Sequence, residues 1–293
     1  MKKFLIAALS ALMVAVMAVS MAACGGTAGV KIIEIDLSTE QYGVAIQKGN
    51  TELAAEINDV LAQLLGDGVE VDGETVTFQS LYEAEMDALA AGEVISIGDV
   101  ATSSSDREEE LVVATNAEFA PFEYRVGTSF GGIDMQVAKI LAEGMGKTLV
   151  IRHMAFESVL QSVQSGESDI ALAGLTINEE RAQQVDFSDP YYDTTQRIAV
   201  SADNTMFDEC KTEEDVVAVL KSLEGATAGA AKTQTGYYYL VGEASFEFEG
   251  YSNIATSAYP TVSAAVQDLV NGTIDLVCAD AVPLQAAVNA VNR

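Results

Sequence analysis

The stretch Ala173-Gly-Leu-Thr-Ile-Asn-Glu-Glu-Arg181 continues directly into Ala182-Gln-Gln-Val-Asp-Phe-Ser-Asp-Pro-Tyr-Tyr192. The largely apolar residues 169–172 in front of it predict a buried strand. The glycine and threonine that follow predict a turn into a short helix that carries Arg181. The start of a helix offers free backbone N–H groups, and arginine adds a planar fork of donors. The stretch therefore predicts a strand-to-helix connection that can hold a carboxylate.

A second interpretation of Arg181 stays open at this point. Glu179 and Asp186 flank it in the sequence, and either acid could bind it. An exposed arginine next to such acids commonly forms a surface ion pair of small energetic value. Residues from elsewhere in the chain have to decide between a ligand clamp and a surface pair.

The start of the chain has the pattern of an export signal. Met1-Lys-Lys3 is followed by an apolar run over residues 4–21 and then by Ala22-Ala-Cys24-Gly-Gly26. No charged stop-transfer segment follows the run, so the pattern predicts a signal peptide and not a membrane span. Cysteine at the cleavage point resembles a bacterial lipobox. It implies a signal peptide over 1–23, a lipid on Cys24 and a short tether over 24–30. We expect a protein anchored by this lipid to the extracytoplasmic face of the cell membrane. An ordinary secreted protein with an incidental cysteine is the alternative.

Composition narrows the classes of function. The formal net charge of −29 argues against nucleic acid as a partner. The single histidine, His153, provides no histidine cluster, and we expect neither a metal nor a cofactor. Export permits a disulfide between the two cysteines that follow Cys24, Cys210 and Cys278, but their spacing does not establish one.

The body of the chain alternates short β-rich runs with amphipathic helical stretches, which is typical of α/β proteins. Its length after the signal, about 270 residues, is enough for two lobes. Residues 51–65 predict one of the helices, with Asn50 as its N-cap. An Asp-Gly turn in residues 69–76 predicts a hairpin, residues 79–91 predict a further helix, and residues 98–110 predict a flexible linker.

Aromatic and charged residues follow several other predicted strands. Phe119, Phe156, Lys232 and Asp280 each come at or after the end of a different one. Ligands usually bind at the strand ends of open α/β sheets. An α-amino acid needs a cation for its carboxylate, an acid for its ammonium group and apolar walls for its side chain. Arg181, Asp280 and the two rings provide these, which favours the ligand clamp over the surface ion pair.

With these residues in place, the chain resembles the bacterial polar amino-acid solute-binding proteins (family 3), the extracellular receptors of ABC importers. The resemblance covers nearly everything from Lys31 onward. It implies a binding site without a catalytic residue, in which the carboxylate, the ammonium group and the side chain of the ligand have separate contacts. The implied ligand-binding residues are Asn116, Phe119 and Phe156 around the side chain, Gly174, Thr176, Arg181, Thr235 and Gly236 at the α-carboxylate, Asp280 at the α-ammonium group, and Lys232 in the pocket wall.

The resemblance also implies the fold. It is an α/β fold of two lobes, of the type II periplasmic-binding-protein kind, in which each lobe is a mixed sheet flanked by helices and a hinge joins the lobes. The expected parts are lobe 1 over 42–66 and 111–197, lobe 2 over 31–41 and 198–293, and a bridging segment over 67–110 with a hairpin, a helix and a linker.

The order of these parts is unusual for the family. Residues 31–65 resemble the family's C-terminal tail, yet they precede Leu111, where the family pattern starts, and Arg293 stands where that tail would begin. Each part appears once. A circular permutation therefore explains the order better than a truncated tandem copy, which stays as the alternative. Such a rearrangement is physically easy where the ends lie close together at a surface.

The function implied by the resemblance is that of a monomeric receptor, which captures an amino acid and delivers it to the permease of an ABC importer. Many relatives carry an acid at the position of Asn116. Asparagine both donates and accepts hydrogen bonds, which favours a polar or uncharged ligand. Glu118 would restore a negative charge if it pointed inward. Two other classes remain. One is an enzyme of the dehydratase type, which this two-lobe fold is known to host, with a carboxylate such as Glu118 as general acid. The other is a ligand-sensing module without transport.

Overall fold

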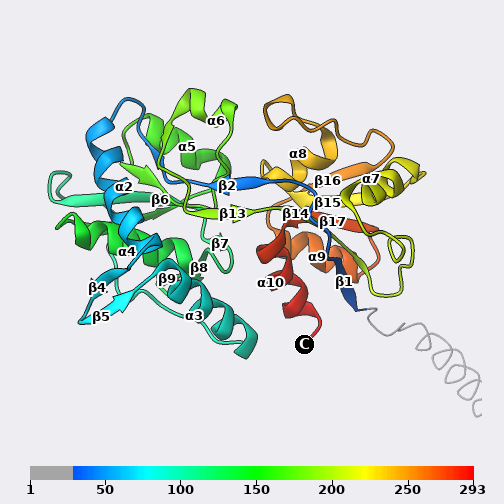
Figure 1. Cartoon of the computed structure of the whole chain (residues 1–293), viewed down its shortest axis with the longest axis horizontal. Helices are drawn as coiled ribbons and strands as arrows, with labels where there is room; N and C mark the ends of the chain where they lie inside the picture. The colour runs from blue at the N-terminus through cyan, green and yellow to red at the C-terminus, as the bar shows by residue number, and fades with distance from the viewer. Residues whose placement is uncertain (1–28) are drawn as a thin grey trace, which may run out of the picture.

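The computed structural model describes residues 29–293, which form two lobes joined by a pair of strands (Figure 1). Each lobe holds a five-stranded mixed sheet with helices packed on it, so the predicted two-lobe α/β fold is confirmed. The predicted signal peptide, Cys24 and most of the predicted tether lie outside the described residues. No helix within residues 29–293 is long and apolar enough to cross a membrane.

Lobe 1, on the left of Figure 1, contains the sheet β10-β6-β11-β3-β12. Every residue of its strand β6 is buried, because β6 lies between two parallel neighbours, β10 and β11. The strands of this sheet are β3 (Ala45–Ile46), β6 (Glu110–Thr115), β10 (Thr148–His153), β11 (Ile170–Ala171) and β12 (Asp186–Phe187). The helices of lobe 1 are α2 (Thr51–Leu65), α4 (Ile133–Gly144), α5 (Phe156–Gln164) and α6 (Glu179–Gln184). A small antiparallel sheet is made of β7 (Glu118–Phe119), β8 (Glu123–Val126) and β9 (Ser129–Gly131).

Lobe 2 contains the sheet β1-β14-β17-β15-β16. Its strands are β1 (Val30–Ile33), β14 (Gln196–Ser201), β15 (Thr227–Ala231), β16 (Ala255–Tyr259) and β17 (Leu276–Asp280). Its helices are α7 (Glu213–Ser222), α8 (Thr235–Val241), the 3₁₀ turn η1 (Ala244–Phe246), α9 (Val262–Val270) and α10 (Ala281–Val291). The side chain of Asn292, just after α10, bonds both backbone groups of Val30, over 3.0 Å to the N–H and 2.8 Å to the carbonyl. The first strand of the lobe therefore lies beside the end of its last helix.

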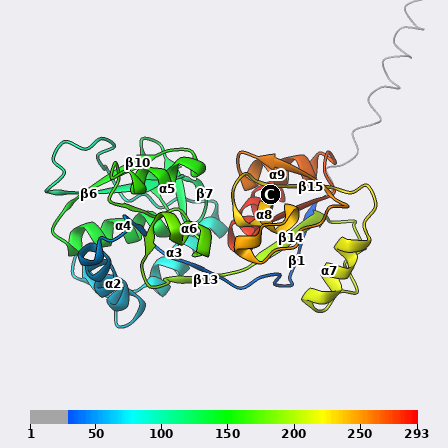
Figure 2. The same ribbon diagram turned by 90° about the horizontal axis from the view of Figure 1, so that it is seen from above.

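Two short antiparallel strands, β2 (Glu40–Tyr42) and β13 (Tyr192–Thr194), run between the lobes (Figures 1 and 2). Along the chain, β2 leads from β1 of lobe 2 to β3 of lobe 1, and β13 leads from β12 of lobe 1 to β14 of lobe 2. Tyr42 and Tyr192 are paired in register, with ring centroids 5.6 Å apart. Residues on these strands can therefore touch both lobes.

The bridging segment packs on lobe 1 and on the hinge strands. It forms the hairpin β4 (Val69–Val71) and β5 (Glu74–Val76), followed by α3 (Phe78–Ala91). The rings of Phe78 and Tyr82 lie 6.1 and 5.9 Å from that of Tyr192. Residues 98–110, predicted as a flexible linker, are held by several contacts with lobe 1 and within the segment. Ala101 bridges Val150 of β10, and the hydroxyls and one backbone N–H of the Ser104-Ser105 pair donate to the Glu110 carboxylate.

Two acids lie in the core of lobe 1 below the strand ends. Glu123 and Asp134 are both fully buried. Asp134 accepts hydrogen bonds from the Gly174 N–H (2.9 Å) and the Tyr191 hydroxyl (2.8 Å). Burial raises the pKa of Asp134 to about 7. Burial, and after it the neighbouring Asp134, raises the pKa of Glu123 well above its usual range. The pair therefore holds protons in the folded protein at a pH where exposed carboxylates have lost them.

These raised pKa values predict that the folded protein loses stability as the pH rises. In the unfolded chain the two acids ionise near pH 4. In the fold burial raises the pKa of Asp134 to about 7 and that of Glu123 well above its usual range, so the stabilisation is complete below pH 4 and is lost as the pH rises through the raised pKa values. We expect Glu123→Gln to flatten the fall in melting temperature between pH 5 and pH 8, by about 2–4 °C for each kcal/mol of pH-dependent stability removed. Exposed Glu118→Gln serves as the control. Scanning calorimetry that gives parallel pH profiles for wild type and Glu123→Gln would contradict the assignment.

Candidate ligand-binding site

Arg181 lies on α6 with its side chain between the two lobes. Its backbone N–H donates to Oδ1 of Asn178, the N-cap of the helix, over 2.7 Å. Its Nη1 donates to the carbonyl oxygen of Thr176 over 2.8 Å. The ring of Phe156 from lobe 1 and the ring of Phe246 from lobe 2 each lie 5.6 Å from the guanidinium carbon. The guanidinium is thus held at its base and placed between two aromatic rings, which favours a desolvated cation there.

The surface ion pair considered for Arg181 is not observed. Among residues 29–293, no carboxylate oxygen lies within 4 Å of its guanidinium nitrogens. Asp186 is paired with Lys48 instead, over 3.3 Å. Arg181 is only 7% exposed, and this burial lowers the pKa of its guanidinium from the ordinary value. A buried charge without a partner is costly, so this geometry favours an anionic ligand.

Asp280 ends β17 and supplies the opposite charge. It is 3% exposed, and its Oδ1 accepts a hydrogen bond from the Tyr42 hydroxyl over 2.7 Å. Burial, and after it the Glu40 carboxylate, raises the pKa of Asp280 to about 7. At neutral pH this carboxyl is therefore only partly ionised, and a cation placed beside it would favour the ionised form.

Threonines from the two lobes meet close to these charges. The Thr176 hydroxyl of lobe 1 donates to Oε2 of Glu40 over 2.9 Å, and it lies 3.2 Å from the hydroxyl of Thr235 in lobe 2. Both threonines are 3% exposed. The lobes are thus in contact at this point, and the contact includes a residue of the hinge strand β2.

Gly174 allows an aromatic ring to approach the turn. Its φ is +53°, and a Cβ at this position would lie 2.7 Å from Cε1 of Phe119. Glycine is therefore required both by the backbone and by the ring. Its N–H donates to Asp134, so the free backbone donor that the sequence predicts here is already engaged.

The residues around Arg181 and Asp280 enclose a cavity of about 10 Å³, which is room for about one water molecule. On its other side, Arg181 borders a cleft of about 320 Å³ that Phe156, Tyr238 and Phe246 also line. Ala173 and Gln234 contribute to the small cavity, and six of the predicted ligand-binding residues line it as well: Phe119, Phe156, Gly174, Arg181, Thr235 and Asp280.

The other predicted residues lie around this cavity without lining it. Asn116 is buried, and its Nδ2 donates to the carbonyl oxygen of Met154 over 2.9 Å. Lys232 is exposed, and its Nζ lies 3.1 Å from Glu157 of the opposite lobe. Gly236 packs closely on the backbone of β17. A Cβ at this position would lie only 2.5 Å from the Cys278 carbonyl oxygen, so a larger residue would not fit.

Three neighbours of the site were missed by sequence reasoning. Glu40 and Tyr42 come from the hinge strand, and Phe246 comes from the 3₁₀ turn of lobe 2. The crossing strand itself is recognisable from the sequence. That its acid lies next to Asp280 follows only from the fold, because the two residues are far apart in the chain.

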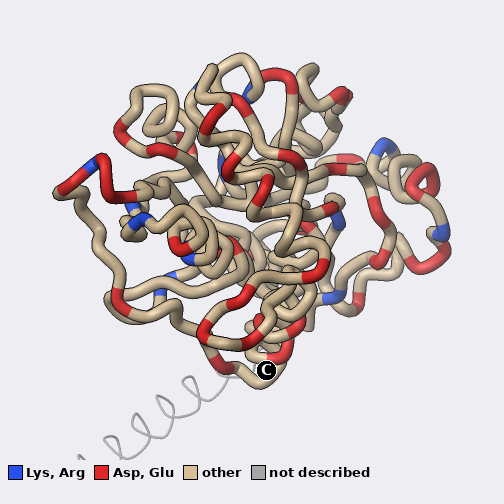
Figure 3. The backbone as a smooth tube through the Cα atoms, turned by 60° about the vertical axis from the view of Figure 1, so that its left-hand side comes forward, with Lys and Arg blue, Asp and Glu red and all other residues tan. Residues whose placement is uncertain are grey.

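The remaining chemistry of the described part is sparse. Within residues 29–293 Cys210 and Cys278 are both free and form no disulfide with each other. No group of three or more histidine, cysteine or acidic side chains within residues 29–293 is placed to hold a metal ion. Acidic residues far outnumber basic ones along the backbone of both lobes (Figure 3).

Comparisons with known proteins identify the family of this chain. The sequence model of the bacterial extracellular solute-binding proteins, family 3, matches residues 111–237. The arginine-binding extracellular protein ArtP of Bacillus subtilis (strain 168) is 33% identical over 132 residues, which are 45% of this chain and 48% of ArtP. The chain thus matches about half the length of that relative. Cyclohexadienyl dehydratase of Pseudomonas aeruginosa is 37% identical over 82 residues, which are 28% of this chain and 31% of the enzyme.

The solved structure of holo ArgBP from T. maritima is similar over a larger part. It is 30% identical with a TM-score of 0.52, and the match covers 63% of this chain and 74% of that one. The match to the family's sequence model and this structural likeness lead to the same assignment. The chain belongs to the bacterial extracellular solute-binding proteins, family 3.

Proposed function

We propose that this protein is an extracytoplasmic receptor that binds an α-amino acid between its two lobes and delivers it to an ABC importer. Its proposed contacts fall into three groups. Arg181, with Gly174, Thr176, Thr235 and Gly236, holds the α-carboxylate, and Asp280 holds the α-ammonium group. Asn116, Phe119 and Phe156 surround the side chain, and Lys232 belongs to the pocket wall.

One observation carries this proposal: Arg181 and Asp280 are buried groups of opposite charge that do not form an ion pair with each other. Arg181 is a buried cation with no carboxylate in ion-pair distance among the described residues, and Asp280 is a buried acid whose direct donor is a tyrosine. The two line the same cavity at the junction of the lobes. A zwitterion with its carboxylate at one end and its ammonium group at the other would satisfy both with charge-assisted hydrogen bonds.

The proposed ligand is a polar or uncharged amino acid. Asn116 supports this preference, because its amide near the side-chain end of the site is neutral and can both donate and accept. The exposed Glu118 does not line the cavity. ArtP is named as an arginine-binding protein, and a mutant of ArgBP from T. maritima has been solved with arginine bound, which makes L-arginine the alternative ligand.

The delivery step and the anchor are also proposals. A lipid on Cys24 would hold the receptor at the membrane close to its permease, and the small distance between Asn292 and Val30 supports a circularly permuted order of the family's segments. Loss of the protein from the membrane fraction in a Cys24→Ser variant tests the anchor. Correct folding of a chain that runs from residue 110 to 293 and then from 30 to 66 tests the permutation.

Thermal-shift screening of the mature protein against the twenty amino acids tests the function directly. A ligand at 100 times its Kd stabilises the native state by about 2.7 kcal/mol. For a chain of this size that corresponds to a rise of about 5–10 °C in melting temperature. We expect such a rise with a polar amino acid, and no rise with any of the twenty would refute the receptor proposal.

The partial likeness to a dehydratase keeps one enzymatic alternative in view. Asp280 holds a proton near neutral pH, as a general acid would need. Chromatography of the mature protein incubated with cyclohexadienyl substrates separates the two functions, because a receptor releases its ligand unchanged and an enzyme releases a product.

A further inference from the structure

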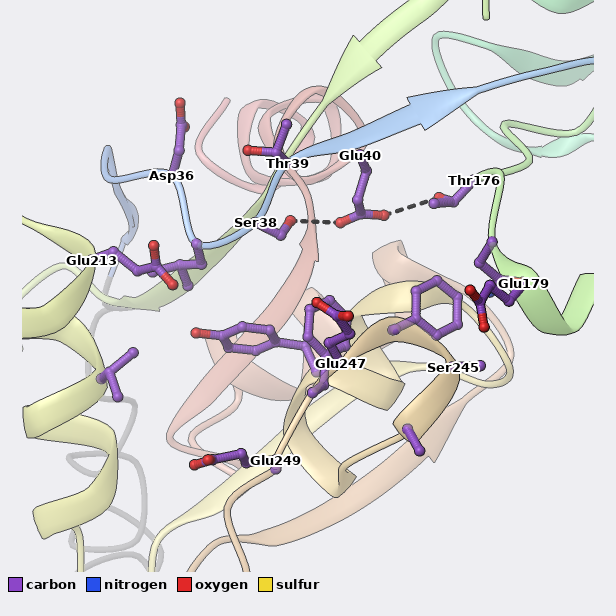
Figure 4. A pocket seen from close by; sticks show the side chains of 18 of the residues that line it. Asp36, Ser38, Thr39, Glu40, Thr176, Glu179, Glu213, Ser245, Glu247 and Glu249 are labelled. Atoms are coloured by element: carbon purple, nitrogen blue, oxygen red, sulfur yellow. Dashed lines mark hydrogen bonds between the residues drawn. The ribbon is translucent and has the colours of Figure 1, made fainter.

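Glu40 differs from every other acid around the large cleft on its side of the hinge. This cleft of about 840 Å³ lies between the lobes and beside β2, and Figure 4 looks into it. The other acids that line it are all exposed, whereas Glu40 is only 6% exposed. These exposed acids are Asp36, Glu179, Glu213, Glu247 and Glu249.

The Glu40 carboxylate is held from both lobes at once. The Ser38 hydroxyl donates to its Oε1 over 2.6 Å, and the Thr176 hydroxyl of lobe 1 donates to its Oε2 over 2.9 Å (Figure 4). The Gln196 amide, at the start of the lobe 2 strand β14, also donates to Oε1 over 3.0 Å. Three neutral donors hold this acid, and no cation among the described residues lies within 4 Å of it.

The same network reaches Asp280. Gln196 is the register partner of Asp280 across β14 and β17, and Tyr42, two residues after Glu40 on the hinge strand, donates to Asp280 over 2.7 Å. Gln196 and Tyr42 therefore connect the buried Glu40, which lines the large cleft, to the buried Asp280, which lines the small cavity with Arg181.

We propose that Glu40 is a second carboxylate of the ammonium subsite, carried by the hinge strand rather than by a lobe, and that it couples amino-acid binding to the release of a proton from Asp280. This inference rests on the proposed function. In the unliganded protein burial, and after it Glu40, disfavours the ionised form of Asp280, so that carboxyl keeps its proton. An incoming ammonium group neutralises the repulsion, Asp280 ionises, and the proton leaves to solvent.

Burial is the largest cause of the raised pKa of Asp280, and Glu40 is the charged group that adds to it. Tyr42 and Tyr192 on the hinge strands, and Cys278 on β17, have pKa values raised above their usual ranges and stay neutral at physiological pH. Glu123 on β8 keeps its proton by burial. Arg181 on α6 is a cation and opposes the effect of Glu40.

The test is calorimetric titration of the mature protein with L-glutamine and, in parallel, L-arginine, between pH 5.5 and pH 8.5 and in buffers of different ionisation enthalpy. For the wild type we expect affinity to fall about tenfold or more from pH 8.5 to pH 5.5, with net proton release near pH 7. For Glu40→Gln we expect about a tenfold loss of affinity at pH 8.5, less than about threefold at pH 5.5, and less proton release than in the wild type.

Two further variants keep the result interpretable. Tyr42→Phe retains the packed ring but removes a donor from the Asp280 carboxylate, so its pH profile should move in the opposite direction, to higher pH. Glu179→Gln, an exposed acid in the same cleft, should match the wild type within about twofold.

Parallel profiles for wild type and Glu40→Gln, whatever their offset, would overturn the proposal, because a merely structural role weakens binding equally at every pH. The same holds for unchanged proton release in the variant. If none of the twenty amino acids binds the wild type in the thermal-shift screen, the proposed function fails and this inference fails with it. Binding with an unaltered profile rejects the role of Glu40 alone.

Discussion

Replacing Arg181 with alanine is expected to lower the affinity for the bound amino acid by a few hundredfold or more. The guanidinium is buried between Phe156 and Phe246, and within residues 29–293 its one hydrogen bond is from Nη1 to the Thr176 carbonyl, which leaves donors for the ligand carboxylate. Truncating one partner of a desolvated charge pair typically costs about 2–5 kcal/mol, because the other charge is left unpaired. Isothermal titration calorimetry of the variant measures the loss.

Two controls sharpen this result. Arg181→Lys keeps the charge but loses the planar fork, so it should fall between the wild type and Arg181→Ala. Arg197→Ala removes an arginine whose ion pairs with Glu34 and Asp36 lie at the surface, and it should leave the affinity unchanged within about twofold. If Arg181→Ala binds the amino acid nearly as well as the wild type, Arg181 does not bind the ligand carboxylate and the proposed site is wrong.

Asp280→Asn is expected to weaken binding by about 30-fold or more while leaving the unliganded protein at least as stable as the wild type. The asparagine can still accept the hydrogen bond from Tyr42, but it offers the ligand ammonium no charge. In the unliganded protein the substitution removes a buried carboxyl whose ionised form is repelled by the Glu40 carboxylate. Because the pKa of Asp280 is raised in the fold, its loss should also reduce the fall in stability as the pH rises towards 7.

Calorimetric titration and thermal melts of the same sample separate these two effects. Asp193→Asn, on the exposed side of the hinge strand β13, is the matched control and should change neither affinity nor the pH profile of stability. An Asp280→Asn protein that is strongly destabilised but binds as well as the wild type would reverse the assignment and make Asp280 a structural residue.

The strand ends could be read from the sequence, and they position the two charged groups. Arg181 follows the apolar run before Gly174, and Asp280 is the last residue of the β17 segment. Residues that bind ligands in α/β folds commonly lie at the ends of strands, so both could be placed at a sheet edge from the sequence. The helix predicted over 51–65 has the same bounds in the structure, with Asn50 accepting from the Leu53 N–H at its start. Local patterns of apolar spacing and capping were sufficient for these elements.

The parts that could not be predicted depend on contacts between distant segments. Glu40 is recognisable only as an acid before a crossing strand, and its place beside Asp280 requires both lobes. The N–H of Gly174 is taken by Asp134, and the amino group of Lys232 by Glu157; each partner comes from another element. Sequence patterns fix which groups reach a sheet edge but not which of them bind each other there.

The proposed site, with Arg181 at the ligand carboxylate and Asp280 at its ammonium group, is tested most directly by a crystal structure. The mature protein would be crystallised with the amino acid that gives the largest thermal shift. The predicted result is an amino acid enclosed between the lobes, with its carboxylate paired to the Arg181 guanidinium and its ammonium group within hydrogen-bond distance of Asp280. An amino acid bound elsewhere, or bound in the reverse orientation with its ammonium group away from Asp280, would contradict it.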